Sequence, residues 1–379
     1  MRFNSTYTSM FKTILPGNNI VYHFIPYKNL DNHIHLIKAT NCTLYIARLA
    51  QLQNCRIFIH GNNSSLFIGD SLMGNADIFV YEKSCVYIGN RIYINGHGGR
   101  QAIRCSGHSN IIIGNNCAIS TDVEITTTDV HLIYDKNTRA RINTEASIFI
   151  GDHVWLSREV KVFKKARISS GCICAARSIV TGHTYPPNSL ISGVPGIIRK
   201  AGEIFWLSPS SYFFSEEEIK HYSLLEENNP MFRNACYIHT SGESISATDL
   251  ETTLKSQQDS HSKISFLYDR LYSNCKHNRF AWMGDNNEPK LLEYKDRLST
   301  LPVTSPPLPQ KEENINIASS DIFVLLYERK IRRKLFFYRL MSHITFGQNK
   351  AHYKSKKKFL RQVLNKIDKL KITAERMFF

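Results

Sequence analysis

The sequence predicts a mainly β protein built around a solenoid, followed by a mainly α C-terminal extension. Three observations carry this prediction: a strict apolar step of six residues, a repeated strand-and-turn phrase, and a change of composition after residue 206. Helices repeat their apolar residues every three to four positions and ordinary strands every second one. A period of six instead fits a short flat strand followed by a corner.

The step of six is strictest between residues 150 and 180. The positions predicted to point inward are Ile150, Leu156, Val162, Ile168, Cys174 and Val180. A small residue follows four places after each of the first five, at Val154, Val160, Ala166, Cys172 and Ser178. Three such sides form a coil of eighteen residues. We expect stacked coils to pair their backbones about 4.8 Å apart.

The upstream part of the solenoid is predicted from one phrase that occurs four times, as SSLFIGD (64–70), SCVYIGN (84–90), NIIIGN (110–115) and SIFIGD (147–152). Each copy is a β-rich run that ends in glycine followed by Asp or Asn. We expect a strand and then a turn residue that tolerates positive φ. Self-similarity of this kind signals a solenoid, and it disfavours the alternative of an irregularly spaced β-sandwich.

The composition divides the chain into five parts. Ser215 and Glu218 form a capping-box signature, which predicts a helix after the solenoid, and a second helix is expected around KISFLYDRLY. The predicted parts are an N-terminal cap at 1–40, the solenoid at 41–206, a helical extension at 207–300, a proline-rich linker at 301–320 and a basic amphipathic helical tail at 321–379.

The tail carries most of the charge. The chain has a net charge of +16, of which the segment from Glu328 to the C-terminus contributes +13. A basic amphipathic surface predicts an anionic partner, either the inner membrane leaflet or an acidic polysaccharide acceptor, and a solvated charge run is the third alternative. No recognised nucleic-acid fold or aromatic–basic platform accompanies the charge, so we expect no nucleic acid.

Cysteine usage and the N-terminus predict a cytoplasmic protein, with peripheral attachment to the inner membrane face as the alternative. The nine cysteines have no pairing or zinc-like spacing, and Cys172 and Cys174 fit small apolar fillers. No apolar run approaches the ~18 residues of a membrane span. The first residues contain no signal-peptide h-region, so we expect no secretion.

One polar segment interrupts the solenoid, TTTDVHLIYDKNTRARINTEAS at 126–147, and we expect it to project as a loop. Its only histidine is His131, with Asp129 two positions earlier. In an extended chain the two side chains would point the same way, so that the carboxylate could orient the imidazole. A solvated surface histidine is the alternative.

Longer motifs resemble a known family. The segments DVHLIYD, RIN, SIFIGDHVWLSREVKVFK, ARSIVTG and YPPNSLISGVPGIIRK, within 110–206, are similar to the hexapeptide-repeat O-acetyltransferases with a left-handed parallel β-helix. The likeness is greatest to the branch that acetylates capsular or other surface polysaccharides, including polysialic acid. It implies an acetyl-CoA-dependent transferase that needs no metal, and a homotrimer with sites between subunits.

The resemblance also implies roles for particular residues. His131 matches the catalytic base of the D-x-H loop, whose acidic residue is Asp129, and Trp155 matches an active-site tryptophan. Its position beside the inward Leu156 predicts that Trp155 points outward, with core packing as the alternative. The residues assigned to acetyl-CoA binding are Arg158, Lys164, Lys165, Ala176, Arg177, Thr181, Arg199 and Lys200. Gly182 stands where the family has lysine, and Ile197 stands where the family's G-N-P-A-K motif has its lysine. Lys164, Lys165 or Arg177 would then supply the phosphate contacts.

Three alternatives remain open at this point. An N-acetyltransferase of a nucleotide-linked amino sugar usually carries an α/β segment in front, for which 1–40 is too short. A metal-dependent β-helix enzyme of the γ-carbonic-anhydrase type needs an H-x₄-H pair, and no histidine pair here has that spacing. A non-catalytic interaction scaffold is the third, and only the basic tail favours it.

Overall fold

The computed structural model describes residues 10–94, 98–208, 211–225, 229–239 and 243–284. These residues fall into two compact units, one within Met1–Ser208 and Leu225–Ser299 and the other within Pro209–Leu224 and Thr300–Phe379. The predicted linker at 301–320 and the predicted basic tail at 321–379 lie outside the described residues.

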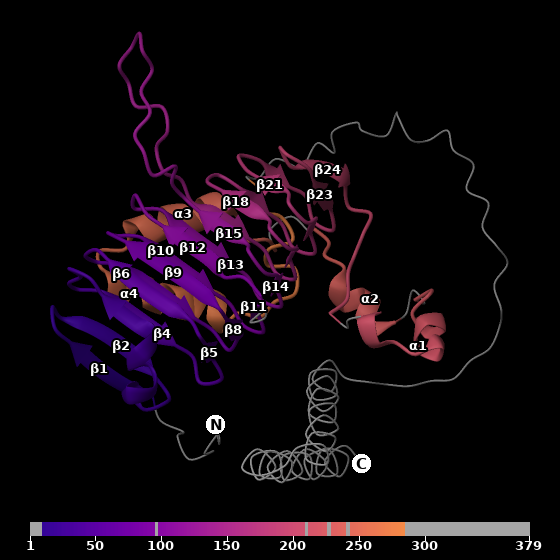
Figure 1. Ribbon diagram of the computed structural model, residues 1–379, viewed down its shortest axis with the longest axis horizontal. Coiled ribbons are helices and arrows are strands. Elements are labelled where there is room, and N and C mark those ends of the chain that lie inside the picture. The colour runs from indigo at the N-terminus through magenta and orange to yellow at the C-terminus, as the bar shows by residue number, and fades with distance from the viewer. Residues whose placement is uncertain (1–9, 95–97, 209–210, 226–228, 240–242, 285–379) are drawn as a thin grey trace, which may run out of the picture. The chain divides into compact units, whose positions relative to one another are not determined.

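The larger unit is a parallel β-solenoid whose strands stack into three sheets (Figure 1). The first sheet has nine strands: β1 (Phe11–Leu15), β2 (Asn19–His23), β4 (Thr43–Ile46), β7 (Ser65–Ile68), β10 (Cys85–Ile88), β13 (Asn110–Ile113), β16 (Ile148–Ile150), β19 (Arg167–Ile168) and β22 (Thr184–Tyr185). β1 pairs antiparallel with β2, and the other pairs in this sheet are parallel.

The second and third sheets close the other two sides of each coil. The second contains β5 (Gln51–Gln53), β8 (Leu72–Gly74), β11 (Tyr93–Ile94), β14 (Ala118–Ile119), β17 (Trp155–Leu156), β20 (Ile173–Cys174), β23 (Leu190–Ser192) and β24 (Ile197–Lys200). The third contains β3 (Ile34–Leu36), β6 (Arg56–His60), β9 (Ala76–Tyr81), β12 (Gln101–Cys105), β15 (Glu124–Thr126), β18 (Lys161–Phe163) and β21 (Ile179–Val180). The antiparallel strand β24 ends the second sheet.

The predicted coil of eighteen residues is confirmed by the register. Ile150 lies opposite Ile168, Leu156 opposite Cys174, and Val162 opposite Val180. All six predicted inward residues and their five small companions are fully buried. No cysteine forms a disulfide, and Cys172 and Cys174 fill the interior as expected. Parallel coils thus bury an aliphatic core between three short sheets.

The repeated glycine has a different purpose from the one predicted. A Cβ on Gly114 would lie 2.6 Å from the carbonyl carbon of Gly151 in the next coil, so close approach of the coils requires glycine there. The positive φ falls two residues later, at Asn116 (φ 60°). The intervening polar side chain bonds to the neighbouring coil, since Asn115 Oδ1 accepts from the backbone N–H of Asn90 at 2.8 Å.

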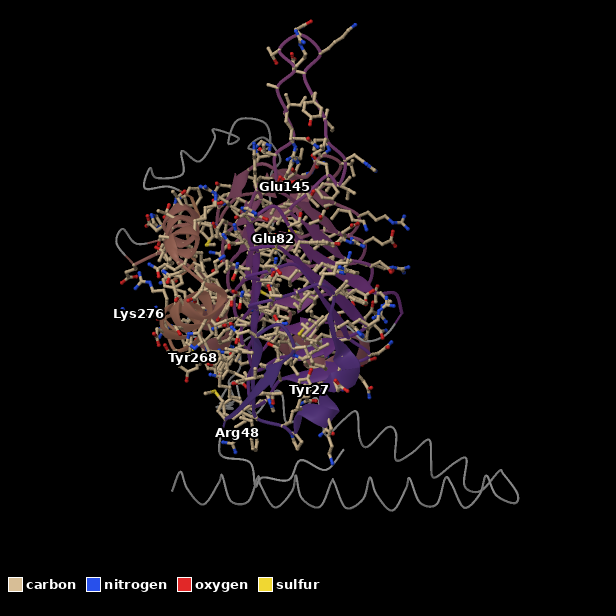
Figure 2. The ribbon with its side chains drawn as sticks, turned by 90° about the vertical axis from the view of Figure 1, so that its left-hand side faces the viewer. Tyr27, Arg48, Glu82, Glu145, Tyr268 and Lys276 are labelled. Atoms are coloured by element: carbon tan, nitrogen blue, oxygen red, sulfur yellow. The ribbon has the colours of Figure 1, made fainter. Side chains whose placement is uncertain are left out.

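Two helices of the extension, α3 (Ala247–Ser256) and α4 (Ser260–Leu267), lie against the outer side of the first sheet, and a π-helical turn, η4 (Tyr268–Tyr272), follows. Leu250, Leu254, Ile264 and Leu267 bury their side chains there. The predicted helix around KISFLYDRLY is confirmed, whereas α3 was not predicted. Tyr268 and Lys276 lie on this helical side in Figure 2.

A buried ion pair joins the segment after these helices to the solenoid. The guanidinium of Arg279, which is 1% exposed, donates two hydrogen bonds of 2.9 Å to the Asp152 carboxylate. Its remaining nitrogen donates to the carbonyls of Leu271 and Asn274. Asp152 belongs to the last glycine–Asp phrase, so the same residue serves the coil corner and the extension.

The remaining helices are short. α2 (Pro230–Ala235) is capped by Asn229, and the 3₁₀ turns η1 (Tyr27–Asn29) and η2 (Asp31–His33) precede β3. The smaller unit contains η3 (Ser211–Phe213) and α1 (Glu216–His221). The predicted capping box is confirmed there, because Ser215 and Glu218 exchange side-chain and backbone bonds. Within the described ranges, no helix is long and apolar enough to span a membrane.

Candidate active site

The segment between β15 and β16 projects from the solenoid, as predicted (Figures 1 and 2). It folds back on itself, with Tyr134 bridged to Arg141, and Glu145 lies at its base. Its exposed apolar side chains are Val130 (74%), Leu132 (58%), Ile133 (48%), Tyr134 (55%) and Ile142 (63%). So many apolar residues gathered on one loop indicate a surface suited to contact with another molecule.

His131 lies in a tight turn near the start of this loop. Its backbone N–H donates to the Asp129 carbonyl at 2.8 Å, and Val130 between them has φ 68°. These features define a γ-turn around a β-branched residue, which is a strained backbone conformation. The His131 side chain is exposed, and its ring forms no hydrogen bond with the described residues. The imidazole is therefore open to a ligand.

Asn143 holds this turn in place. Its amide Nδ2 donates to the His131 carbonyl at 2.7 Å, and its Oδ1 accepts from the Ile133 backbone N–H at 2.9 Å. Asn143 is itself buried. The two bonds connect the outgoing and returning strands of the loop, so Asn143 determines where the His131 backbone lies.

The expectation of an extended chain between Asp129 and His131 is wrong, because the backbone makes a γ-turn at Val130. The Asp129 carboxylate instead pairs with the ammonium of Lys164 in the next coil. That ammonium holds the pKa of Asp129 below its usual range. In the single chain, Asp129 therefore anchors the loop to the solenoid.

Trp155 points outward from β17 and is 37% exposed, as the sequence predicts. One side of its ring lies against Trp206, at a centroid distance of 5.8 Å. Trp206 stacks on His153 at 4.0 Å with an interplanar angle of 2°, and a ring nitrogen of each donates to the backbone carbonyl of the other at 2.8 Å. Burial lowers the pKa of His153, which favours the neutral ring. Trp155 thus stands on a rigid aromatic support.

His131 and Trp155 lie on different sides of the solenoid. The loop leaves the corner between the third and first sheets, whereas Trp155 projects from the second sheet. In a three-sided coil, that corner faces away from the remaining side. One chain therefore does not bring the two residues together.

The predicted acetyl-CoA residues separate into three groups. Arg158, Ala176 and Arg177 lie at the corner between the second and third sheets, where Glu159 pairs with both arginines. Lys164, Lys165 and Thr181 lie at the next corner, where the Thr181 hydroxyl donates to the Lys164 carbonyl at 3.5 Å. Arg199 and Lys200 are exposed on β24, and Arg199 Nε donates to the Ser192 hydroxyl at 2.9 Å.

Asn143 holds the His131 turn and Trp206 supports Trp155, but neither residue was singled out from the sequence. Asn143 belongs to the RIN motif quoted for the family resemblance, and that motif was the available signal. Trp206 lies at the end of the closing segment, 51 residues after Trp155. No local pattern indicates their contact, because it depends on how the chain returns across the last coils.

No protein-family model matches the chain, but curated relatives do. It is 31% identical over 124 residues to the polysialic acid O-acetyltransferase of Neisseria meningitidis, covering 33% of this chain and 56% of the relative. It is 28% identical over 142 residues to the polysialic acid O-acetyltransferase of Escherichia coli O1:K1 / APEC, covering 38% and 45%. The chain thus spans about half the length of the curated relatives it matches.

Two solved structures with similar names can be superposed on parts of the chain. The polysialic acid O-acetyltransferase OatWY superposes with a TM-score of 0.40 at 24% identity, over 49% of this chain and 90% of that one. The polySia specific acetyltransferase NeuO superposes with a TM-score of 0.37 at 21% identity, over 59% and 91%. The sequence relatives confirm the predicted resemblance: over about a third of its length, this chain is similar in sequence to two polysialic acid O-acetyltransferases.

Proposed function

We propose that this protein transfers an acetyl group from acetyl-CoA to a hydroxyl of an acidic surface polysaccharide of the polysialic acid type. The observation that carries the proposal is its sequence similarity to two polysialic acid O-acetyltransferases from different organisms. Two side chains fit acetyl transfer: the exposed imidazole of His131 and the indole of Trp155, which packs against Trp206.

The proposed reaction needs one acid–base group from the protein, which accepts a proton and later returns it. A sugar hydroxyl is a weak nucleophile at neutral pH, and the acetyl thioester is already activated. The His131 imidazole accepts the hydroxyl proton as the oxygen attacks the carbonyl carbon, which accelerates the reaction by ~10²–10⁴-fold. A backbone N–H of a coil or the indole N–H of Trp155 stabilises the oxyanion. When the oxyanion collapses, the carbon–sulfur bond breaks, the imidazolium of His131 returns the proton to the sulfur, and coenzyme A leaves as the thiol.

We further propose that the active unit is a homotrimer in which His131 of one subunit meets Trp155 of its neighbour. The positions of the two residues on different sides of one solenoid support this assembly. The exposed apolar residues of the loop support it too, since a neighbouring subunit would cover them. Light scattering should report three copies, and an active monomer would contradict the shared site.

The deciding experiment measures loss of the acetyl-CoA thioester with purified protein and a panel of acceptors. We expect turnover with a sialic acid polymer, none with an uncharged glucan, and a product that loses its acetyl group in mild base, as an ester does. Turnover only with a nucleotide-linked amino sugar, giving a base-stable amide, would favour N-acetylation. Turnover with none of them would contradict the proposal.

A further inference from the structure

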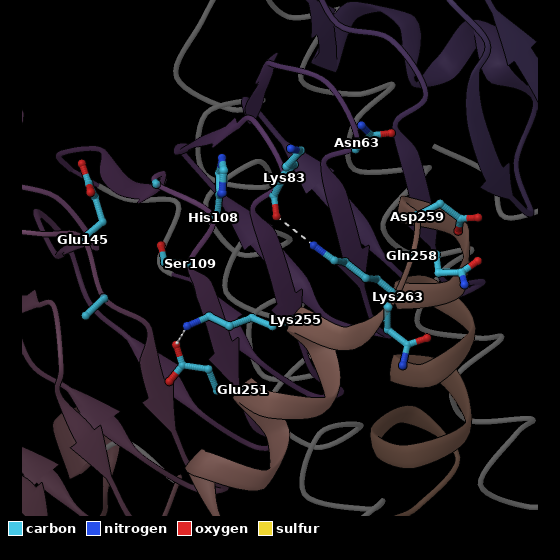
Figure 3. Close-up of a pocket in the computed structure, with 13 residues that line it drawn as sticks. Asn63, Lys83, His108, Ser109, Glu145, Glu251, Lys255, Gln258, Asp259 and Lys263 are labelled. Carbon is cyan, nitrogen blue, oxygen red and sulfur yellow. Dashed lines mark hydrogen bonds and ion pairs between the residues drawn. The ribbon is translucent and has the colours of Figure 1, made fainter.

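A hollow of about 430 Å³ opens between the solenoid and the connection from α3 to α4 (Figure 3). Its solenoid wall includes Asn63, Lys83 and His108, one from each of three successive coil corners. Its far wall comes from the helices and includes Gln258 and Lys263. The volume lies within the ~300–1,000 Å³ typical of small-ligand sites.

Lys263 is the unusual residue of this hollow. It is only 8% exposed, and its side chain reaches from α4 toward Lys83 (Figure 3). Its ammonium donates one hydrogen bond, of 2.8 Å, to the Lys83 backbone carbonyl. An ammonium has three donors, and no carboxylate of the described chain pairs with this one. A buried cation with so little compensation favours an anionic ligand.

The three acidic residues that line the hollow bond to groups other than Lys263, Lys83 and His108. Glu145 accepts from Arg141 at 2.7 Å, and Glu251 accepts from Lys255 at 2.8 Å and from Ser147. The third acid, Asp259, caps α4 by accepting from the Ser262 backbone N–H. None of the three carboxylates therefore pairs with Lys263, Lys83 or His108.

The ammonium of Lys83 and the imidazole of His108 have no hydrogen-bond or ion-pair partner among the residues that the structure describes. Both side chains are exposed at the rim of the hollow, above the buried Lys263. Three cationic or potentially cationic groups thus face one polar cavity without an acidic partner.

The hollow adjoins the proposed catalytic loop. The corners that carry Asn63, Lys83 and His108 connect the third sheet to the first, and the loop leaves the next corner along the same edge. Glu145 and Ala146, at the base of the loop, also line the hollow. A polymer held in the hollow could therefore continue along this edge toward His131.

We propose that this hollow is a second binding site for the acceptor polymer, in which the carboxylate of an acidic sugar unit pairs with Lys263, Lys83 and His108. Side-chain amides at its lining, those of Asn63 and Gln258, suit the neutral groups of the same sugar. The choice of an acidic sugar rests on the proposed function, whereas the anion site rests on the geometry alone.

The test is the rate at which an amine-reactive reagent labels Lys83, measured by mass spectrometry without acetyl-CoA. We expect a sialic acid tetramer to slow labelling at least fivefold, and uncharged maltotetraose to leave it unchanged. Lys276, exposed outside the hollow, is the internal control and should be labelled equally in all samples. In Lys263→Met the protection of Lys83 should disappear, while Lys276→Met retains it.

The labelling experiment tests the binding site in the hollow independently of the proposed acetyl transfer. Lys83 labelled equally with and without the tetramer overturns the site, even if the protein acetylates the polymer. Equal protection by sulfate at the same concentration overturns the acidic-sugar assignment, since any small anion then suffices. Protection that persists in Lys263→Met also overturns the proposal. If Lys263→Met does not fold, the protection of Lys83 in the wild-type protein decides the test. Protection of Lys83 without acetyl transfer contradicts only the proposed function.

Discussion

The coils at 148–192 and the loop at 127–147 are neighbours in sequence but are built on opposite principles. In the coils, one apolar residue per side is buried, and each backbone pairs with the layers before and after it. In the loop, aliphatic residues face outward, and side-chain bonds from Asn143 supplement a few backbone bonds between its two strands. The comparison shows which part stabilises the protein and which part is left available for chemistry.

His131→Ala should have the largest effect and should act on chemistry alone. Removing the proposed base should lower kcat by ~10²–10⁴-fold. The melting temperature should not change, because the side chain is exposed and unbonded to the described residues. Lys136→Ala, also exposed on the loop, is the matched control and should remain active. Wild-type turnover in His131→Ala would remove the histidine from the mechanism.

Ile168→Ala should have the opposite effect. The residue is fully buried between Ile150 and Tyr185 in the first-sheet ladder, so truncation should lower the free energy of unfolding by ~2–5 kcal/mol. Turnover per folded molecule should stay near that of the wild type. Thr144→Ala in the exposed loop provides the control and should change stability by less than ~0.5 kcal/mol. Denaturant titration measures the free energy of unfolding of both variants. Equal decreases in the two would contradict the contrast between the coils and the loop.

Asn143→Ala should lower both stability and kcat, each by an intermediate amount. The His131 carbonyl and the Ile133 N–H each lose a partner, at a cost of ~1 kcal/mol or more per bond. A displaced base should lower kcat about tenfold while the KM for acetyl-CoA stays unchanged. Asn137→Ala, at the exposed part of the loop, is the control. A rise in that KM with unchanged kcat would show that Asn143 does not position His131.

The smallest effect should be the pH dependence that His153 adds to stability. Burial lowers its folded-state pKa below 6.5, so the unfolded chain binds a proton first as the pH falls. The stabilisation is therefore complete above about pH 6.5 and decreases as the pH falls from there toward the folded-state pKa. His153→Asn tolerates the positive φ of 56° at this position and should lose this part of the pH profile. Parallel melting curves between pH 7.5 and 5.5 would test it.

Periodic residues made much of the fold predictable from sequence. One inward position per six residues leaves only a three-sided coil as a consistent arrangement, so Ile150, Leu156 and Val162 were placed correctly without any tertiary information. The loop was also predictable, because its polar run does not fit a coil. His131 and Trp155 could be named because they lie inside contiguous motifs.

Contacts between segments distant in sequence could be decided only by the tertiary structure. The pairing of Asp129 with Lys164, the support of Trp155 by Trp206 and the ion pair between Asp152 and Arg279 join residues 35, 51 and 127 positions apart. The cavity around Lys263 likewise exists only because α4 lies against the first sheet. A local pattern encodes which way a side chain faces along its own strand. It cannot encode which other segment lies there, because that depends on how the whole chain packs.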